Sequence, residues 1–351
     1  MDIFLGNLQI TPEILNLISD IDQFKGAWQQ MNTLSPERLS ALKRVATIES
    51  VGSSTRIEGA KLTDREIEAL LSHVENQTFE TRDEQEVAGY AFVCEQIFTH
   101  FHQMLLSENG IKQLHTWLLQ FTEKDSRHRG SYKKVPIRIE AFDGEGKSKG
   151  VIFETTSPFE TPFQMERLVN WTNDAFQRKE WHPLIIIGLF IVIFLAIHPF
   201  QDGNGRLSRL LTTLLMLKNG YFYAPYTSLE SIIEANKESY YLALQKTQKN
   251  WQNEQVDWNA WLLFFFRCLA RQKTHLEAKL VREAVIVKAL PPLAQNIVEL
   301  VREHGSLKIK ELEALTEANR NTLKKTLQTL TKEKKITLHG KGKGVWYSLF
   351  L

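Results

Sequence analysis

The sequence predicts a mainly α-helical protein, a helical bundle with one β-hairpin flap and a small C-terminal helix-turn-helix unit. Apolar residues recur at helical spacing through most of residues 10–280. Within that region only residues 135–155 alternate apolar and polar side chains as a two-stranded hairpin does. Residues 290–351 combine short helical patterns with two short strands.

Length and composition favour a soluble protein with more than one domain. The chain has 351 residues, of which 43% are hydrophobic and 24% charged, and a formal net charge of +2. Such values are ordinary for globular proteins and provide no global attraction to nucleic acids or membranes. Residues 1–10 lack the pattern of a secretion signal. The most apolar run, residues 184–197, is shorter than the roughly 20 residues of a membrane span. We therefore expect a cytoplasmic protein without a membrane partner.

The N-terminal region, residues 1–105, is predicted to be helical. Thr11-Pro12-Glu13 has the residue types of a helix start. A second helix is expected near residues 35–48, and residues 50–59 that follow are small, polar and poor in core residues. Thr63 and Glu66 form the pattern of a capping box before another helix. Further helices are expected at about 84–106 and 109–121.

The central region is predicted to contain the hairpin and a series of helices. Two alternating runs, residues 135–142 and 151–155, flank a Gly-rich link at 143–150. Cys94 and Cys268 lie in apolar helical patterns, which favours two buried free thiols over a disulfide or a metal pair. The helices are expected at about 163–176, 183–197, 206–219, 229–248 and 257–280.

The C-terminal region is predicted to be a winged-helix domain. The core pattern lapses near residues 282–292, where Pro291 and Pro292 favour a linker. Helices are expected at about 293–303, after Ser306 and at 319–332, and strands at 336–339 and 345–349. Residues 302–343 contain 11 Lys and Arg against 5 Asp and Glu. The presumed third helix and the wing carry the residues Arg320, Asn321, Lys324, Lys325, Lys341 and Lys343.

The basic face leaves two interpretations open. Residues 306–344 could meet DNA phosphates and base edges. Equally, the domain could be a protein-interaction or dimer-packing module with a solvated basic face. The sequence does not fix the oligomeric state, and a homodimer stays open.

A polar loop between two apolar helices carries the chemistry. It has the sequence His198-Pro199-Phe200-Gln201-Asp202-Gly203-Asn204-Gly205-Arg206-Leu207-Ser208-Arg209. Asp202 is a hard oxygen ligand that suits Mg²⁺ held against phosphate oxygens. Gly203, Asn204 and Gly205 let backbone N–H groups converge at a helix start, which forms an anion site. The loop therefore has the residue types that phosphate chemistry on a nucleotide needs.

Three side chains of the loop complete this reading. Arg206 and Arg209 stand three residues apart on the following helix and reach the same end. His198, at the end of the preceding helix, could accept a proton near neutral pH. No Gly-x-x-x-x-Gly-Lys-Ser/Thr phosphate loop occurs anywhere in the sequence.

Residues 198–209 resemble, without departure, the signature of the Fic (filamentation induced by cAMP) family, His-Pro-Phe-x-Asp-Gly-Asn-Gly-Arg-x-x-Arg. The resemblance extends over about residues 10–280 and implies a Fic-type helical bundle with a hairpin flap. It implies a catalytic core at 106–285 between the N-terminal region and the winged-helix domain. The activity implied is a protein adenylyltransferase, which transfers AMP from ATP to a protein hydroxyl.

The resemblance also implies a role for each loop residue. His198 is the base that deprotonates a target Tyr, Thr or Ser, and Asp202 binds Mg²⁺ on the α and β phosphates. Asn204 and the loop amides hold the phosphates. Arg206 and Arg209 grip the β and γ phosphates, and pyrophosphate leaves.

Two further regions acquire roles from the same resemblance. Tyr240 and Tyr241 match the position where the family lines its adenine pocket, although tyrosines that only pack helices stay an equal alternative. The hairpin at 135–155 would dock the target segment by strand addition.

A restraint on activity is expected upstream. Ser54-Thr55-Arg56-Ile57-Glu58-Gly59 fits the inhibitory motif of the family, Ser/Thr-x-x-x-Glu-Gly/Asn. The Glu58 carboxylate would pair with Arg209, repel the triphosphate and misplace the α phosphate. A local cap or salt bridge of Glu58 is the alternative.

Two other functions stay open at this stage. The chain could be a winged-helix DNA-binding regulator whose Fic core is a nucleotide-responsive module. It could also be a Fic enzyme that uses another nucleotide donor or removes AMP.

Overall fold

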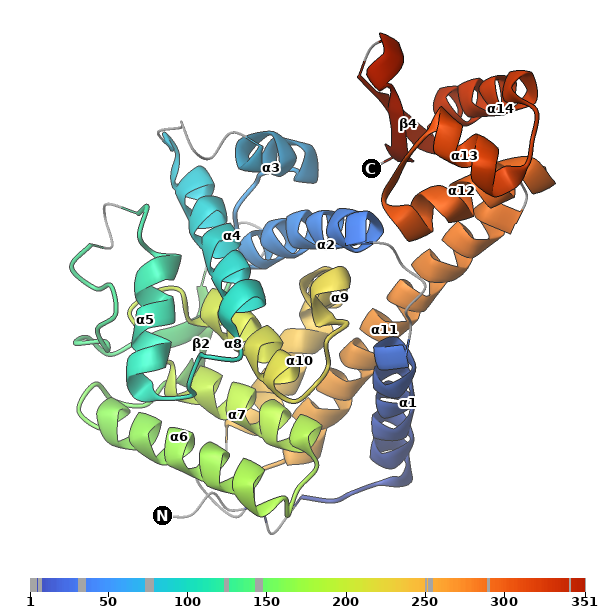
Figure 1. Cartoon of the computed structure of the whole chain (residues 1–351). Coiled ribbons are helices and arrows are strands. Elements are labelled where there is room, and N and C mark those ends of the chain that lie inside the picture. The colour runs from blue at the N-terminus through green and yellow to red at the C-terminus, as the bar shows by residue number, and fades with distance from the viewer. Residues whose placement is uncertain are drawn as a thin grey trace. The chain divides into compact units, whose positions relative to one another are not determined.

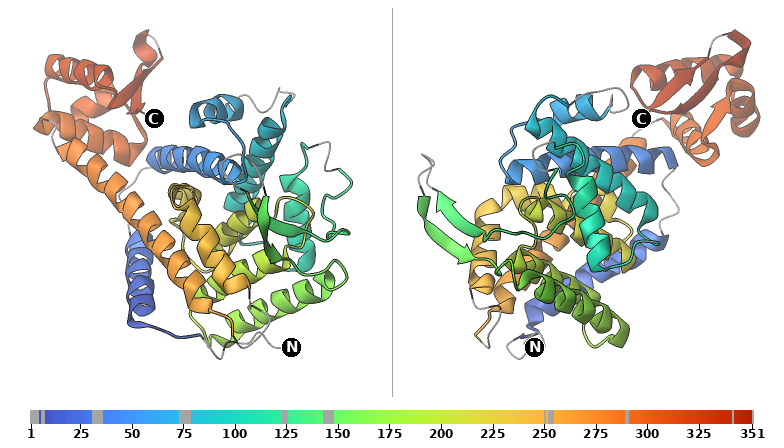
Figure 2. Two further views of the ribbon diagram at one scale, coloured as in Figure 1. Left: turned by 180° about the vertical axis from the view of Figure 1, so that it is seen from behind. Right: turned by 90° about the vertical axis from the view of Figure 1, so that its left-hand side faces the viewer.

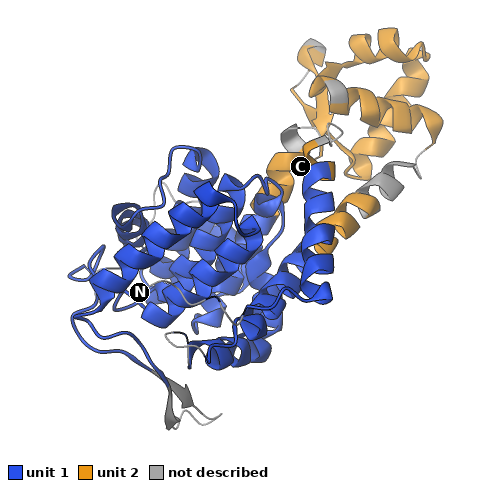
Figure 3. Cartoon of the chain, turned by 90° about the horizontal axis from the view of Figure 1, so that it is seen from below, with its two compact units in different colours: residues 1–26, 46–272 blue, residues 27–45, 273–351 orange. Residues whose placement is uncertain are grey.

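The computed structural model describes residues 5, 8–30, 36–72, 79–122, 126–142, 148–249, 251, 255–288, 291–340 and 342–350. The described chain is mainly helical with small β-sheets (Figure 1), so the predicted fold class is confirmed. It divides into two compact units, residues 1–26 with 46–272 and residues 27–45 with 273–351 (Figure 3). Among the described residues, no helix has both the length and the hydropathy of a membrane-spanning segment.

The secondary structure follows the predicted order with several changes of boundary. The helices are α1 (Pro12–Gln30), α2 (Pro36–Ile57), α3 (Asp64–Leu71), α4 (Arg82–His100), α5 (Glu108–Leu118), α6 (Thr161–Arg178), α7 (Pro183–Ile197), α8 (Asn204–Lys218), α9 (Leu229–Ala235), α10 (Lys237–Gln248), α11 (Trp258–Lys288), α12 (Pro292–His304), α13 (Ile309–Thr316) and α14 (Arg320–Lys332). The strands are β1 (Arg138–Phe142), β2 (Ser148–Glu154), β3 (Ser306–Lys308), β4 (Ile336–His339) and β5 (Trp346–Leu349).

Helix α7 is the centre of the first unit. Every residue from Leu184 to Ile197 is buried, which explains why its sequence is apolar on all sides. Pro183 stands at its first position, and the His182 side chain accepts a hydrogen bond from the Leu184 amide. The helix packs against α6, α8 and α10. Trp261 of α11 donates a hydrogen bond of 2.7 Å to its Gly188 carbonyl. The chemistry-bearing loop therefore begins on a firmly held element.

The end of α2 differs from the expectation for residues 50–59. The structure continues the helix to Ile57 and buries the side chains of Ser53, Ser54 and Thr55. The Thr55 hydroxyl donates to the Val51 carbonyl over 2.9 Å. Small polar residues can occupy a buried helix face when the helix itself satisfies their hydroxyls. These residues lack the apolar periodicity on which the prediction relied.

The hairpin is present as predicted. Strands β1 and β2 pair antiparallel (Figure 2), with register irregularities after Ile139 and after Ala141. The Gly-rich link at 143–147 lies outside the described residues. At the base of the hairpin, the Thr155 amide and hydroxyl both donate to the Ile137 carbonyl.

The predicted helix 229–248 is two helices, α9 and α10, which meet at Asn236. The Asn236 side-chain amide donates to the Ile232 carbonyl over 2.7 Å. Helix α11 runs to Lys288, past the predicted end at 280 and into the region expected to be a linker. Cys94 and Cys268 are buried free thiols, as predicted.

The second unit contains α12, β3, α13, α14, β4 and β5 in chain order. Its strands form one antiparallel sheet in the order β3-β5-β4. Strand β3 was not predicted, because three residues are too few to establish an alternating pattern. Lys341 lies outside the described residues. The unit has its own core, formed by Ala294, Ile297, Val298, Val301, Leu307, Leu312, Leu323, Leu327, Leu330, Ile336 and Leu349.

Candidate active site

His198 ends α7 in a left-handed conformation, with φ of 53° and ψ of 61°. Its Nδ1 lies 3.3 Å from the Leu195 carbonyl oxygen. Because a carbonyl only accepts, Nδ1 carries the hydrogen, and Nε2 of the neutral ring is left with its lone pair. Burial, reinforced by the charge of Lys133, lowers the pKa of His198 to about 4. The imidazole is therefore neutral and able to accept a proton at pH 7.

Lys133 fixes the backbone just before this histidine. Its Nζ donates to the Ile197 carbonyl over 2.8 Å and to the Thr155 hydroxyl over 2.7 Å. Its amide donates to the Pro199 carbonyl over 2.8 Å. Burial lowers the pKa of this lysine to about 8. One side chain thus connects the start of the loop to the base of the hairpin.

The loop closes on itself through Asn204. Its side-chain oxygen accepts from the Phe200 amide over 2.9 Å, and its side-chain nitrogen donates to the Phe200 carbonyl over 2.7 Å. His115 of α5 stacks on the Phe200 ring at 3.8 Å and contacts the Asp202 carbonyl through Nε2 at 3.0 Å. The Gly130 amide donates to the His115 Nδ1. In this structure the Asn204 amide shapes the loop; its predicted contact with phosphates stays a prediction.

Asp202 and Arg206 belong to a network of charges. Arg206, only 1% exposed, places its guanidinium nitrogens 2.9 Å from Asp202 and 2.9 Å from Glu86 of α4. Arg82 pairs with both Glu86 and Asp202, at 2.8 and 3.1 Å. Burial alone would raise the pKa of Asp202, but Arg206, the Gly203 amide and Arg82 outweigh it and lower that pKa. The Asp202 carboxylate is therefore ionised and faces the cavity described below.

The predicted anion site lies at the start of α8. Gly203 caps the helix with φ of 78°, a left-handed conformation that glycine adopts without strain. At Gly205, an added Cβ atom would lie 2.1 Å from the Glu58 Oε1. A carboxylate therefore lies against the first turn of α8, where the helix dipole favours negative charge.

The same carboxylate holds Arg209, which is 3% exposed. Its Nη2 donates to the Glu58 Oε1 over 2.7 Å and to the Ser54 carbonyl over 3.0 Å, and its Nε donates to the Ser54 hydroxyl over 2.8 Å. Burial alone would lower the pKa of Arg209, but the Glu58 charge outweighs it and raises that pKa. Within the described residues, the buried Nη1 of Arg209 makes no hydrogen bond. Gly59, with φ of 108°, turns the chain away after Glu58.

A cavity of about 340 Å³ lies beside the loop, and neither Arg206 nor Arg209 is among the residues that line it. The loop residues that line it include His198, Asp202, Gly203, Asn204 and Gly205. Glu58, the two tyrosines Tyr240 and Tyr241, and the hairpin residues Ile137, Arg138 and Phe153 also line it. The structure thus brings the predicted adenine-pocket tyrosines to the same cavity as the histidine. The volume lies in the range of small-molecule sites.

The functional neighbours that the sequence did not reveal are Lys133, Glu86, Arg82 and His115. Each comes from an element distant from the loop in sequence, and none belongs to a pattern that predicts a site. The Thr81 capping box begins α4 and so sets the position of Arg82 and Glu86. This capping box is a local sequence pattern that indicates a helix start. It does not indicate that Arg82 and Glu86 contact the loop.

Comparisons with known proteins indicate one family. Residues 105–216 match the Fic/DOC family. The chain is 28% identical to a probable protein adenylyltransferase of Aquifex aeolicus over 111 residues, 32% of this chain and 34% of that protein. It is 25% identical to protein adenylyltransferase Fic of Drosophila mojavensis over 224 residues, 62% of this chain and 42% of that protein. The chain spans less than half the length of these curated relatives.

Solved structures show the same fold. A Fic family protein from Desulfovibrio desulfuricans G20 has a TM-score of 0.63 at 22% identity, covering 99% of this chain and 98% of that chain. A Fic domain containing signaling protein from Bacteroides thetaiotaomicron has a TM-score of 0.58 at 24% identity, covering 75% of this chain and 94% of that chain. With its signature loop between α7 and α8, the chain therefore carries a Fic/DOC family domain at residues 105–216.

Proposed function

We propose that this chain is a protein adenylyltransferase that transfers AMP from ATP to a Tyr, Thr or Ser hydroxyl of a target protein and of itself. The observation that carries the proposal is a neutral His198 in one cavity with an anion site at the start of α8. The names of the relatives from Aquifex aeolicus and Drosophila mojavensis support the same reaction.

In the proposed reaction the target hydroxyl oxygen attacks the α phosphorus of ATP. The bond between that phosphorus and the oxygen bridging to the β phosphate breaks, and pyrophosphate leaves. The hydroxyl proton moves to the Nε2 of His198, whose Nδ1 hydrogen is held by the Leu195 carbonyl. The backbone amides of Gly203 and Gly205 and the Arg209 guanidinium hold the phosphates. The role of Arg206 as a phosphate ligand remains part of the proposal, and its present partners are Asp202 and Glu86.

Asp202 fits the proposed Mg²⁺. Among the described residues there is no group of three or more His, Cys, Asp or Glu side chains that could hold a metal. Mg²⁺ in nucleotide sites needs only one or two carboxylates, because phosphates and water supply its other ligands. Asp202, ionised and 38% exposed at the cavity, meets that requirement. The ion would neutralise charge on the α and β phosphates.

Glu58 is the proposed restraint. It lies against Gly205 and forms an ion pair with Arg209, so it would compete with the γ phosphate for both. The Glu58→Gly variant should incorporate labelled AMP into itself about tenfold faster or more, because one charge-assisted hydrogen bond contributes roughly 1.5–3 kcal/mol. Glu166→Gln, at an exposed position on α6, is the matched control. Equal labelling of wild type and Glu58→Gly would reject the restraint.

His198→Ala in the Glu58→Gly background tests the reaction itself. AMP transfer should disappear while ATP binding, measured by calorimetry, persists. Continued transfer by this double variant would show that His198 is not the base. The same assay with labelled GTP, CTP and UTP tests whether another nucleotide is the donor.

The hairpin of β1 and β2 is the proposed docking site for the target, since an extended segment can add to its edge. Ile137, Arg138 and Phe153 place its base on the wall of the catalytic cavity. Replacement of residues 139–152 by a short Gly-Ser link in the Glu58→Gly background should reduce transfer to the target and leave ATP binding intact. Full transfer to the target would contradict this docking.

We propose a second function, DNA binding, for the winged helix formed by the second unit. Helix α14 contains no acidic residue, and it buries Leu323 and Leu327 while Arg320, Lys324 and Lys325 are exposed. Such a one-sided basic helix after a turn resembles a recognition helix. Duplex DNA should shift in a gel at low salt with wild type and not with Lys324→Gln/Lys325→Gln. A shift that persists in the double variant would reject the role of α14, and self-association without DNA binding would favour the dimer-packing alternative.

A further inference from the structure

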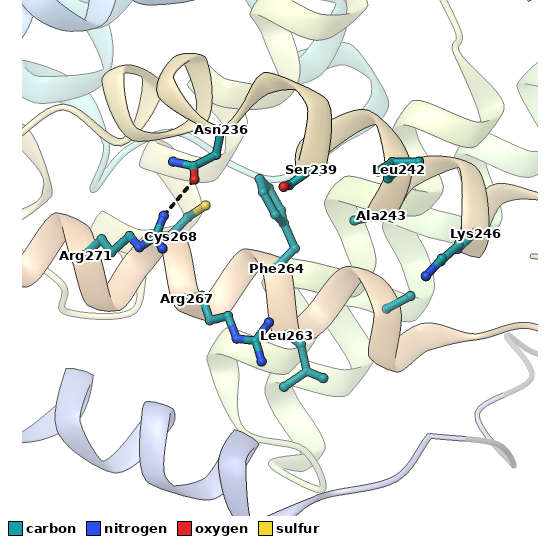
Figure 4. A pocket seen from close by; sticks show the side chains of 11 residues that line it. Asn236, Ser239, Leu242, Ala243, Lys246, Leu263, Phe264, Arg267, Cys268 and Arg271 are labelled. Atoms are coloured by element: carbon teal, nitrogen blue, oxygen red, sulfur yellow. Dashed lines mark hydrogen bonds between the residues drawn. The ribbon is translucent and has the colours of Figure 1, made fainter.

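A second cavity of about 390 Å³ lies between α10 and α11 of the first unit (Figure 4). Helix α10 is shared by both cavities. Ser239, Leu242 and Lys246 line the second one, whereas Tyr240 and Tyr241 line the catalytic one. The volume of the second cavity again suits a small molecule. Nothing in the proposed reaction uses it.

The charged side chains that line the second cavity are all basic. Its lining includes Lys246, Arg267 and Arg271 and no Asp or Glu. Arg267 pairs with Glu13 of α1. Arg271 instead donates to the neutral side chain of Asn236 over 2.8 Å, the contact drawn in Figure 4. Among the described residues no carboxylate pairs with Arg271 or Lys246, so an anionic group would be attracted to this cavity.

Much of the remaining lining of the second cavity is apolar. Leu263, Phe264 and the buried Cys268 line it, and Leu242 is 57% exposed at its edge. Figure 4 shows Phe264 between the side chains of Asn236 and Leu242, with Arg271 and Lys246 toward opposite ends. A ligand with an apolar body and an acidic end would thus satisfy both features.

Side chains that line the two cavities pack against each other. The Phe264 ring lies 5.8 Å from the Tyr240 ring and 5.9 Å from the Trp261 ring, measured between centroids. Tyr240 is 4% exposed and lines the catalytic cavity. In a close-packed interior, a ligand that moves Phe264 or α10 must also move Tyr240.

We propose that this second cavity binds a small organic anion, with its acidic group at Arg271 and its apolar body against Phe264. Occupancy then changes nucleotide affinity through Phe264, Tyr240 and α10. This second part rests on the proposed function and on the predicted role of Tyr240 in lining the adenine pocket. Carboxylate, phosphate and sulfonate share the chemistry that Arg271 would recognise.

Anilinonaphthalene sulfonate is the probe, because it combines a sulfonate with apolar rings and fluoresces when bound. Wild type should bind it saturably, and Arg271→Gln should bind it at least about tenfold more weakly. Ser239→Phe, a substitution at an exposed position, should block binding by filling the cavity. Thermal unfolding of each variant confirms folding. Equal affinity of wild type, Arg271→Gln and Ser239→Phe would overturn the site, and so would loss of binding in His198→Ala, since it would place the probe in the catalytic cavity.

The coupling has its own measurement. The dissociation constant of a non-hydrolysable ATP analogue should change at least about threefold when the probe is saturating, and the analogue should change probe affinity by the same factor. Arg271→Gln should remove this change. If the dissociation constant of the analogue does not change in wild type, the coupling is rejected, but the proposal of an anion site is not affected. Because probe binding needs no catalysis, failure of the proposed reaction in the Glu58→Gly variant would be seen separately.

Discussion

Replacement of Lys133 by methionine tests whether this lysine sets the proton affinity of His198. Lys133 is 3% exposed, and its Nζ donates to the Ile197 carbonyl over 2.8 Å and to the Thr155 hydroxyl over 2.7 Å. Methionine has a similar length and no charge. The Ile197 carbonyl then loses its side-chain partner, which costs about 1–3 kcal/mol for a buried acceptor. Thr155 keeps its bond to Ile137.

The more specific effect is on acid–base behaviour. Burial first and the Lys133 charge second lower the pKa of His198 to about 4. Without that charge the imidazolium form becomes more favourable, so the pKa of His198 rises. A change on the order of 1 kcal/mol would raise its proton affinity about fivefold. The acid limb of the rate profile should therefore move to higher pH.

The assay is the initial rate of AMP transfer from pH 4 to 8 in the Glu58→Gly background. Lys133→Arg keeps the charge and should keep the acid limb, and Thr155→Val removes only the hairpin contact. An unchanged acid limb in Lys133→Met, with altered rates alone, would show that Lys133 positions the loop without tuning His198. The same limb shift in Thr155→Val would assign the effect to the hairpin.

Stability gives an independent check on the same residue. Its folded-state pKa is about 8 against an ordinary value of 10.5, so the unfolded chain binds more protons between these pH values. The unfolding free energy of the parent should therefore rise relative to Lys133→Met as pH increases through this window. A constant difference across the window would contradict the burial effect.

Three further predictions concern the restraint, the packing and the helix propensity of α1. Arg56 holds the end of α2 through Glu234 at 2.7 Å and Asp64 at 2.8 Å, so Arg56→Met should raise automodification a few-fold. The same change in the Glu58→Gly background should have no effect, and equal stimulation in both backgrounds would exclude a role in restraint. At Gly89 a Cβ atom would lie 2.0 Å from the Leu118 carbonyl oxygen, so Gly89→Ala should lower the unfolding free energy in urea by about 2 kcal/mol or more. At Gly26 nothing lies within 4 Å, so Gly26→Ala should instead add about 0.5–1 kcal/mol; a loss there would contradict the helix-propensity reasoning.

The sequence predicted those parts of the fold that repeat a local pattern. The apolar run before His198 is the fully buried helix α7, and the alternation around residues 135–155 is a hairpin. The sequence did not predict the end of α2, because its buried hydroxyls are satisfied by hydrogen bonds and give no apolar pattern. The Thr55 hydroxyl donates to the Val51 carbonyl of the same helix, and the Ser54 hydroxyl accepts from Arg209 of α8. The three residues of β3 are strand because β5 pairs with them, which is a contact between distant segments.

The site was predictable where its residues are contiguous. The loop from His198 to Arg209 lies within twelve residues and carries a specific pattern. Its supporting contacts, from Lys133, Glu86 and His115, form only when the chain folds. For that reason the sequence predicted Arg206 only as a phosphate ligand and did not predict its ion pairs with two carboxylates.

The contact between Glu58 and Gly205 has a consequence for how activity can evolve. In the proposed mechanism the resting carboxylate and the nucleotide phosphates use the same backbone turn and the same Arg209 guanidinium. A substitution on α8 that weakens binding of the Glu58 carboxylate must then also weaken binding of the phosphates. We therefore expect no substitution on this helix to raise activity. Selection for higher activity should instead yield substitutions at the end of α2, and selection for lower activity should yield substitutions in the loop at residues 198–209. Random mutagenesis followed by selection for higher activity, and separately for lower activity, should therefore give substitutions in two different segments of the chain.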